Sequence, residues 1–173
     1  MEVDKNVTNP LLVGAMQLLR AEDNSEHKSM FMAEMSRATL LCPALIDPEP
    51  EKTPDGGYRL LPDSKLKFPM LTAMDGKNFF VAYTDVMSLK KNGEGGNVGT
   101  PEEFRKHYVT MAFADYGRML LTRTPEGGES PCYGIVVNPF GENLVVTMPM
   151  VAAIMQRIGT AVRKAGMDPD EVL

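Results

Sequence analysis

The sequence predicts an α+β fold: a single domain in which a mixed, mainly antiparallel sheet has helices packed on it. Apolar stripes with the period of a helix lie near both ends of the chain, and an Asp-Gly turn between apolar segments indicates a β-hairpin in the middle. Helices and strands do not alternate in the regular way of a parallel βαβ fold. At 173 residues, the chain has the length of one domain, residues 1–173.

Two helices are predicted near the N-terminus, after residues 1–8, which we expect to be disordered. Asn9 is a good N-cap, Pro10 suits the first helical position, and apolar residues follow at helical spacing. A second helix is predicted over residues 25–37. Its three methionines cannot all face one core, so at least one is expected at the surface: Met30, Met32 and Met35.

Short apolar segments after these helices indicate strands. Residues 39–46 form the first, and Pro43 suggests a sheet edge or a bulge because proline cannot donate a hydrogen bond to a neighbouring strand. Residues 47–52 are rich in proline and charge, which predicts a stiff, solvated connector. Residues 58–61 are interpreted as another short strand.

Asp75-Gly76 is the strongest local signal in the chain. Both residues tolerate positive φ, so we predict a two-residue type I′ turn, which pairs Thr72 with Phe79 across the hairpin. Both faces of this hairpin are apolar. We therefore expect it inside a sheet that is covered on both sides, or covered by one helix layer and an oligomer contact.

Short elements follow the hairpin. Asp85 is placed to cap a helix, and residues 92–99 form a glycine-rich loop. A capping box at residues 100–103 predicts a short helix to about residue 108. A strand is predicted over residues 109–112.

The last third of the chain alternates clear elements with turns. A helix is predicted from residue 113, a buried strand over 134–137, a type I turn at 138–141 and a strand over 143–146. The final helix begins at Pro149 and stops before a glycine. Its apolar stripe comprises Met148, Val151, Ala152, Met155, Ile158 and Val162.

Composition excludes several classes of function. A net charge of −5 disfavours nucleic acid as a partner, since contact with phosphates depends on Lys and Arg. The longest apolar stretches fall far below the ~20 residues of a membrane-spanning helix, and the N-terminus does not resemble a signal peptide. The two cysteines, Cys42 and Cys132, form no CxxC pair, so we expect a cytoplasmic location.

Patterns that carry catalytic or cofactor chemistry are weak. The loop at residues 93–99 does not match a dinucleotide fingerprint or a P-loop. Glu103 and His107 would share one helix face as half of a metal site or, as we favour, as an ordinary exposed pair; His27 stands alone. Cys132 is interpreted as a buried structural thiol. We therefore predict no catalytic residue, no cofactor and no metal.

The turn at residues 138–141 holds the candidate interaction site, composed of Asn138, Phe140 and Gly141. Asn and Gly serve the backbone of such a turn, whereas Phe140 has no role in it. An aromatic side chain at a turn either packs onto the core, which is our first interpretation, or docks a partner.

Four segments together resemble the N-terminal domain of the SseB (enhanced serine sensitivity) family: residues 9–11, 40–44, 68–72 and 133–142. Their order and rough spacing match over about residues 9–162. The resemblance implies a bacterial α+β domain without established catalytic residues. The family name refers to a serine-sensitivity phenotype and not to a biochemical activity, so no residue role is carried over to this chain.

The function expected from the sequence is that of a non-enzymatic domain for protein interaction or regulation. Our first interpretation of the 14 methionines is that they fill gaps in the core; the alternative is an adaptable surface for a protein partner or for self-association. Together with the missing catalytic motifs and the two apolar faces of the hairpin, this excess of methionine motivates the interaction hypothesis. The alternative is an enzyme or small-metabolite sensor connected with amino-acid metabolism, motivated by the phenotype behind the family name.

Overall fold

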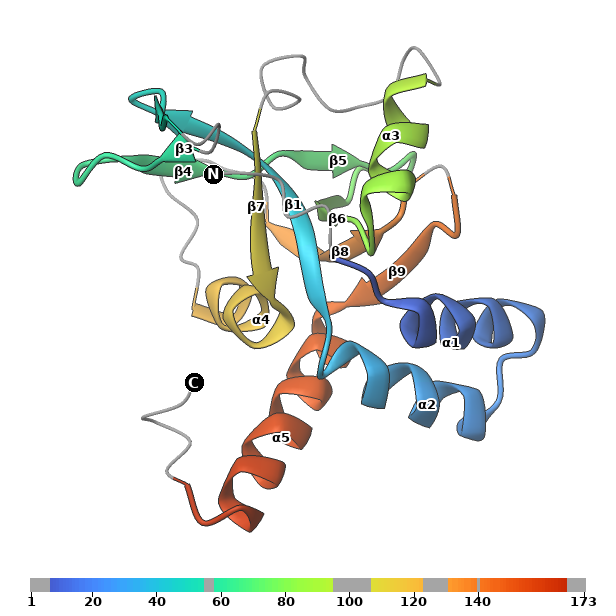
Figure 1. Cartoon of the computed structure of the whole chain (residues 1–173). Helices are drawn as coiled ribbons and strands as arrows, with labels where there is room; N and C mark the ends of the chain where they lie inside the picture. The colour runs from blue at the N-terminus through green and yellow to red at the C-terminus, as the bar shows by residue number, and fades with distance from the viewer. Residues whose placement is uncertain (1–6, 55–57, 95–106, 123–130, 140, 168–173) are drawn as a thin grey trace.

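A computed structural model describes residues 7–54, 58–94, 107–122, 131–139 and 141–167 of the chain. The described part contains five helices and nine strands in mainly antiparallel sheets (Figure 1). The predicted α+β class is confirmed. Among the described helices, none is long and apolar enough to cross a membrane.

A four-stranded sheet forms one half of the scaffold. Its strands are β5 (Met70–Thr72), β6 (Asn78–Ala82), β8 (Cys132–Val137) and β9 (Leu144–Thr147), in that order. The central pair, β6 and β8, is parallel, and both outer pairs are antiparallel. The carboxyl ends of β6 and β8 therefore meet at the same edge of the sheet.

A three-stranded sheet continues this scaffold. It consists of β4 (Lys65–Lys67), β1 (Thr39–Asp47) and β7 (His107–Ala112), with β1 in the middle. Leu41 in β1 exchanges two backbone hydrogen bonds with Tyr83, of 2.9 and 2.8 Å, just beyond the end of β6. This bridge joins the two sheets.

Pro43 lies within β1, between two neighbouring strands, and not in an edge strand as predicted. Backbone N–H groups two residues apart point to the same side of a strand, so the nitrogen of Pro43 faces the same side as that of Leu41. On that side of β1, Leu41 pairs with Tyr83, and the pairing with β4 begins only at Leu45. Pro43 lies between these two and has no partner there among the described strands. The missing N–H therefore costs no hydrogen bond in the ladder.

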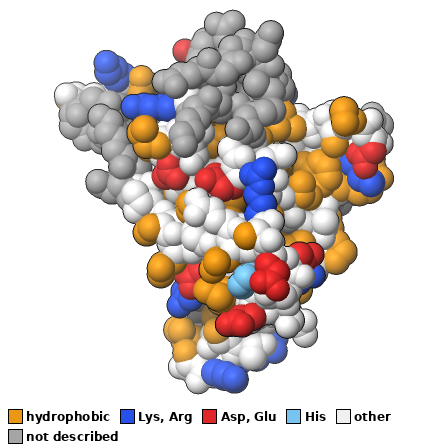
Figure 2. Space-filling view, turned by 90° about the vertical axis from the view of Figure 1, so that its right-hand side faces the viewer, with side chains coloured by type: hydrophobic (Ala, Val, Ile, Leu, Met, Phe, Trp, Pro, Cys, Tyr) orange, Lys and Arg blue, Asp and Glu red, His pale blue; other side chains and the backbone are white. Residues whose placement is uncertain are grey.

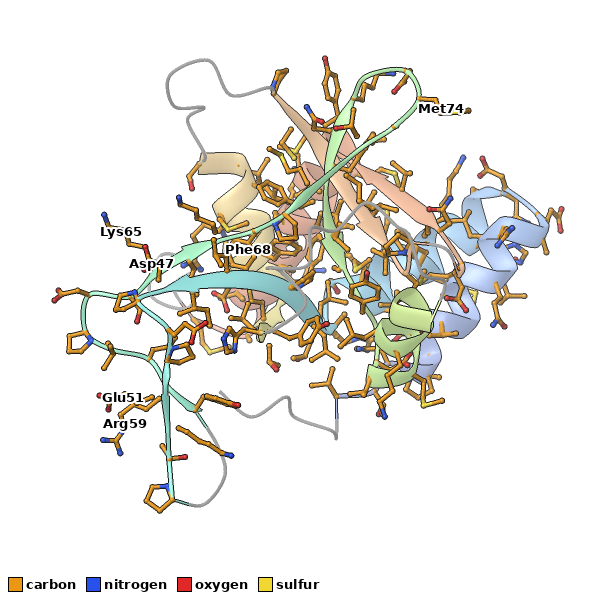
Figure 3. All side chains as sticks on the ribbon, turned by 90° about the horizontal axis from the view of Figure 1, so that it is seen from above. Asp47, Glu51, Arg59, Lys65, Phe68 and Met74 are labelled. Atoms are coloured by element: carbon orange, nitrogen blue, oxygen red, sulfur yellow. The ribbon has the colours of Figure 1, made fainter. Side chains whose placement is uncertain are left out.

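The segment predicted to be a solvated connector is partly strand. β1 continues to Asp47, and β2 (Glu51–Lys52) pairs with β3 (Tyr58–Arg59) to form an exposed arm. Residues of opposite charge face each other across these strands, Asp47 opposite Lys65 and Glu51 opposite Arg59 (Figure 3). Such cross-strand pairs favour one register over its neighbours.

Four helices cover one face of the sheets. They are α1 (Pro10–Ala21), α2 (Ser25–Met35), α4 (Phe113–Thr122) and α5 (Met148–Lys164), and their apolar sides enclose the main core with Phe80 and Ala82 of β6. Met35 is buried and Met30 is 43% exposed, as the sequence predicted for this group of methionines. In α5, Ile154 is buried and Ala152 is exposed, so the predicted stripe is wrong at Ala152.

A smaller cluster lies on the opposite face of β6. Val81 and Tyr83 pack there with Leu89 of α3 (Val86–Glu94) and with Val7. β6 is therefore covered on both sides, as the two apolar faces of the hairpin predicted. The expected disorder of residues 1–8 does not extend to Val7, which is 7% exposed.

The β5–β6 hairpin closes through a three-residue loop, so the predicted two-residue turn is wrong. Ala73 N donates to Lys77 O at 2.8 Å, and Thr72 pairs with Asn78 instead of Phe79. A type I′ turn needs positive φ at both central residues, but only Gly76 has it, at 80°. Phe80 therefore lies opposite Met70, and Met70 packs with it against the main core.

The helix predicted to reach residue 108 also differs. His107 and Tyr108 belong to strand β7, where Tyr108 lies opposite Pro43. The capping box at residues 100–103 and most of the glycine-rich loop lie outside the described residues, while α3 extends through Glu94. Pairing with β1 determines the strand conformation at residue 107.

Candidate functional site

A buried polar cluster lies at the carboxyl ends of the parallel strands β6 and β8. Asn138 directly follows β8 and Thr84 lies two residues beyond β6; their exposed fractions are 1% and 0%. Asn138 has a φ of 48°, a left-handed conformation that asparagine adopts more readily than most residues. Its backbone N–H donates to Ala82 O at 2.9 Å, which extends the strand pairing by one residue.

The side-chain amide of Asn138 is fully used inside the protein. Its Oδ1 accepts from Thr84 N at 2.9 Å, and its Nδ2 donates to Thr84 Oγ1 and to Glu142 Oε2, both at 2.8 Å. Both donors of this buried amide are therefore occupied within the protein, so it holds the structure together and has no donor left for a ligand. We interpret Asn138 as a clamp between the ends of β6 and β8.

Asn9 joins this cluster from the start of α1. Although it occupies the N-cap position, its side chain makes no capping hydrogen bond, in contrast to the prediction. Its Nδ2 instead donates to Thr39 O at 2.8 Å and to Thr84 O at 2.7 Å. Without the Asn9 side chain, these two carbonyl groups would lose this hydrogen-bond donor. Leaving a buried carbonyl group without a donor costs more free energy than leaving the start of a helix uncapped.

Asp85 caps α3, as the sequence predicted. Its Oδ1 accepts from Ser88 N at 2.8 Å, and its Oδ2 accepts from the hydroxyls of Thr84 and Ser88. Partial burial acts to raise the pKa of Asp85, but the hydrogen bonds from Ser88 and Thr84 outweigh it and hold the pKa below its usual value.

We expect Asp85→Ala to lower the free energy of unfolding by about 1 kcal/mol at neutral pH, because the cap of α3 is lost. A lowered pKa means that the carboxylate stabilises the fold above its unfolded pKa of about 3.9 and loses this effect as the pH falls through the folded value. In urea unfolding, the difference in free energy of unfolding between the variant and the unchanged protein should therefore be smaller at about pH 3 than at pH 7. Equal differences at both pH values would contradict a role for the charge.

The predicted interaction residues are only partly accessible. Asn138 is buried, Phe140 lies outside the described residues, and Gly141 is at the surface. Gly141 N donates to Asn138 O at 3.0 Å, and its carbonyl oxygen lies 3.4 Å from Nη1 of Arg20 in α1. The proposed docking role of this turn stays a prediction.

The two cysteines differ in their surroundings. Cys42 is completely buried in the main core, and this burial raises the pKa of its thiol far above the usual value, so it is not a thiolate at neutral pH. The adjacent Tyr116 hydroxyl donates to Val81 O at 3.1 Å. Cys132, which we predicted to be buried, is only half-buried, and its Sγ lies 3.2 Å from Gly134 O.

Both histidines contact neighbouring groups of the protein. His107 makes an edge-to-face contact with Tyr58 at 5.6 Å between ring centroids, and His27 Nδ1 lies 2.8 Å from Glu22 O. Within the described ranges, no group of three or more His, Cys, Asp or Glu side chains is close enough to hold a metal ion. Glu103 lies outside these ranges.

An apolar hollow of about 770 Å³ lies at the surface between the tip of the β5–β6 hairpin, strands β8 and β9, and the start of α5. Exposed or half-buried apolar side chains form most of its lining, notably Met74, Phe79, Tyr133, Val145, Met148 and Pro149. In Figure 2, this surface lies towards the right, where orange side chains gather near an adjacent red and blue pair. We call it the apolar hollow.

A row of side chains across three strands builds this surface. Phe79 of β6 and Tyr133 of β8 contact each other with ring centroids 6.4 Å apart, and Val145 of β9 is 40% exposed. Met74 at the hairpin tip is fully exposed and points away from the body of the molecule (Figure 3). α3 covers the neighbouring part of the same sheet face but leaves this part open.

The charged groups of the hollow satisfy each other. Lys77 Nζ lies 2.6 Å from Asp75 Oδ2 and 5.8 Å from the centre of the Tyr133 ring. A hydrogen bond from Lys77 lowers the pKa of the Asp75 carboxyl, and the same bond raises the pKa of Lys77. The hollow therefore offers apolar contact area, with a pair of opposite charges, Asp75 and Lys77, at its rim.

Sequence patterns indicated only part of this site. The apolar second face of the hairpin pointed to a contact at Phe79, but Tyr133 lay just outside the strand predicted over 134–137. The bulge between β6 and β8 places Tyr133 beside Phe79, and no local pattern announces such an irregularity. The hollow was therefore not predicted.

Comparison with known proteins decides the family. The family model described as SseB protein N-terminal domain matches residues 12–153, most of the chain. The chain belongs to the SseB family. No curated protein and no solved structure matches it. In this SseB-family domain, the match includes the clamp residue Asn138 and all the described lining residues of the apolar hollow, and it ends within α5.

Proposed function

We propose that this SseB-family domain is non-enzymatic and acts by binding another protein through the apolar hollow. The observation that carries the proposal is the solvent-open row of Phe79, Tyr133 and Val145, with the fully exposed Met74 beside it. Exposed apolar surfaces of this kind mark interaction sites, and aromatic and methionine side chains are enriched in them. Methionine also adapts its shape to a partner.

The size of the hollow suits contact with one short segment of a partner better than a large interface between two folded proteins. Eleven of the described residues line it, whereas a stable interface of standard size uses about 20–30 residues on each side. A transient, regulatory contact suits this extent. The two free cysteines suit a reducing compartment such as the bacterial cytoplasm.

The variant Tyr133→Asp tests this function, because it places a charge in the hollow at a side chain that is 42% exposed. We expect at least a threefold loss of bis-ANS fluorescence, since the dye reports accessible apolar surface. A protein captured by the unchanged domain should also be lost. The melting temperature should change little.

Met87→Asp is the matched control, since Met87 is 65% exposed on α3 and does not line the hollow. It should keep both the dye signal and the captured protein. Equal effects of the two variants would contradict a role for the hollow.

A small-metabolite sensor, or an enzyme, connected with amino-acid metabolism is the second candidate. A volume of about 770 Å³ lies within the range of small-molecule pockets, roughly 300–1,000 Å³. Its polar lining is sparse, which makes recognition of a charged amino acid difficult. Thermal-shift screening of amino acids and nucleotides would favour this candidate if a stabilising ligand were lost in Tyr133→Asp.

A further inference from the structure

A second surface, separate from the apolar hollow, runs along the outer side of α5. Two adjoining depressions of about 450 and 310 Å³ share Arg157 and Ala161 in their lining. The second depression lies between α5 and the end of α2, and Arg37 is part of its lining. We call this surface the α5 groove. The apolar hollow lies at the other end of the helix, at Met148 and Pro149.

The α5 groove is cationic in an acidic protein. The whole chain has a net charge of −5, yet the 17 residues of α5 include three basic and no acidic side chains. Among the residues that the structure describes, neither depression has an Asp or Glu in its lining. The charge of this surface is therefore opposite to that of the protein as a whole.

Stabilisation of the helix explains the positions of two of the three basic residues of α5 but not that of Arg157. Arg163 and Lys164 lie in the last turn, where basic residues interact favourably with the helix dipole. Arg157 lies two turns earlier, and its neighbours four residues away on the helix are alanines, Ala153 and Ala161. No acid on the same face of the helix is placed to pair with it.

The cations of the groove differ in whether they form an ion pair within the protein. Arg37 is bound to Glu34 at 2.5 Å between Nη2 and Oε1. Among the described residues, neither Arg157 nor Lys164 takes part in an ion pair. Both side chains are exposed on the lining of the same depression, so both are available to a carboxylate of another molecule.

We infer that the α5 groove binds an acidic amphipathic helix of a partner protein. Arg157 and Lys164 are seven residues apart, or about 10.5 Å along the helix, which is the spacing of side chains two turns apart on a second helix. Ala161 lies between the two cations and Ala153 lies one turn before Arg157, and their short side chains let a second helix approach closely. Carboxylates of the partner pair with Arg157 and Lys164, and its small apolar side chains lie over the alanines.

Charge and size favour a peptide over nucleic acid. Two unpaired cations neutralise at most two phosphates, which supplies little of the affinity that phosphate contacts provide. The net charge of −5 also repels a polyanion over longer distances. An acidic peptide needs only a local cationic surface.

The test uses two fluorescein-labelled peptides, each a two-heptad alanine- and leucine-based helix, in fluorescence anisotropy with the full chain. One carries Glu at two positions seven residues apart, and the other carries Gln there. We expect the Glu peptide to bind about tenfold more tightly at low salt, with the difference shrinking as salt rises, because exposed ion pairs are screened. Arg157→Gln should reduce the Glu-over-Gln preference about threefold or more.

Arg118→Gln is the matched control. It makes the same change of charge on an exposed helical position of α4, at a residue that does not line the groove. It should leave the preference unchanged, as should Tyr133→Asp in the apolar hollow. Failure of the hollow as a binding site and failure of the groove are thus distinguishable.

Three outcomes would overturn the inference: equal binding of the two peptides, an equal loss in Arg157→Gln and Arg118→Gln, or tighter binding of a labelled DNA duplex that Arg157→Gln abolishes. A dimer of the chain alone that Arg157→Gln dissociates in light scattering would also overturn it, since a second copy would then fill the groove.

Discussion

Gly134→Ala is expected to destabilise the domain by about 3 kcal/mol or more, or to prevent folding. Gly134 lies in β8 with a φ of 148°, a conformation that side chains rarely adopt. A Cβ atom there would lie 2.0 Å from Val146 O and 3.0 Å from Thr147 Cα. These are backbone atoms of the neighbouring strand β9, so the strands would have to separate to admit a methyl group.

Gly14→Ala is the control for this variant. Gly14 lies in α1, and a Cβ atom added there meets nothing within 4 Å. Because alanine favours a helix over glycine, we expect a gain of about 0.5–1 kcal/mol. Urea unfolding followed by circular dichroism compares the two variants, and an unchanged midpoint for Gly134→Ala would show that β8 and β9 are not packed as described.

Asn138→Asp is the second variant with a large expected effect, about 2–4 kcal/mol at neutral pH. Aspartate has nearly the same shape and also tolerates positive φ, so the backbone at Asn138 is not strained. The amide that donates to Glu142 Oε2 at 2.8 Å is replaced by a carboxylate oxygen. Two negative charges then share a partly buried site, and neither has a donor for the other.

The pH dependence distinguishes this cause from simple loss of packing. Two adjacent carboxylates raise the pKa of one of them in the folded state, so the penalty is present at neutral pH and falls as the pH drops through that raised value. The double variant Asn138→Asp/Glu142→Gln should recover much of the stability at pH 7, since the glutamine amide introduced at position 142 can donate a hydrogen bond to the new carboxylate. Melting temperatures from pH 4 to pH 8 provide the measurement. A penalty independent of pH and unchanged in the double variant would contradict the proposed contact.

Local elements were predictable where the cause is local. α5 was predicted correctly from Pro149 at its start, the glycine beyond its end and the spacing of its apolar residues, because helix ends and stripes depend on residues a few positions apart. The cap at Asp85 was also correct, since Ser88 N is three residues away. The family assignment came from four short segments together and is confirmed over residues 12–153.

Predictions failed where a distant partner competes with a local preference. The hairpin at Asp75-Gly76 was correct in place but wrong in register, because Gly76 alone has positive φ and the loop closes with three residues instead of two. Asn9 was expected to cap α1, yet its side chain holds the carbonyl groups of Thr39 and Thr84, 30 and 75 residues away. A buried carbonyl without a donor costs more free energy than a missing cap at an exposed helix end.

The sequence by itself determined the α+β class, the family and the position of most helices and strands, since periodicity and turn chemistry act over a few residues. Only the tertiary structure decided which polar groups form the clamp at Asn138 and which apolar groups form the hollow. Both depend on strands from separate segments: β6 and β8 meet at their carboxyl ends, and the bulge between them places Tyr133 beside Phe79. Contacts between residues 54 positions apart have no signature in the local sequence, because the whole sheet must form before those side chains meet.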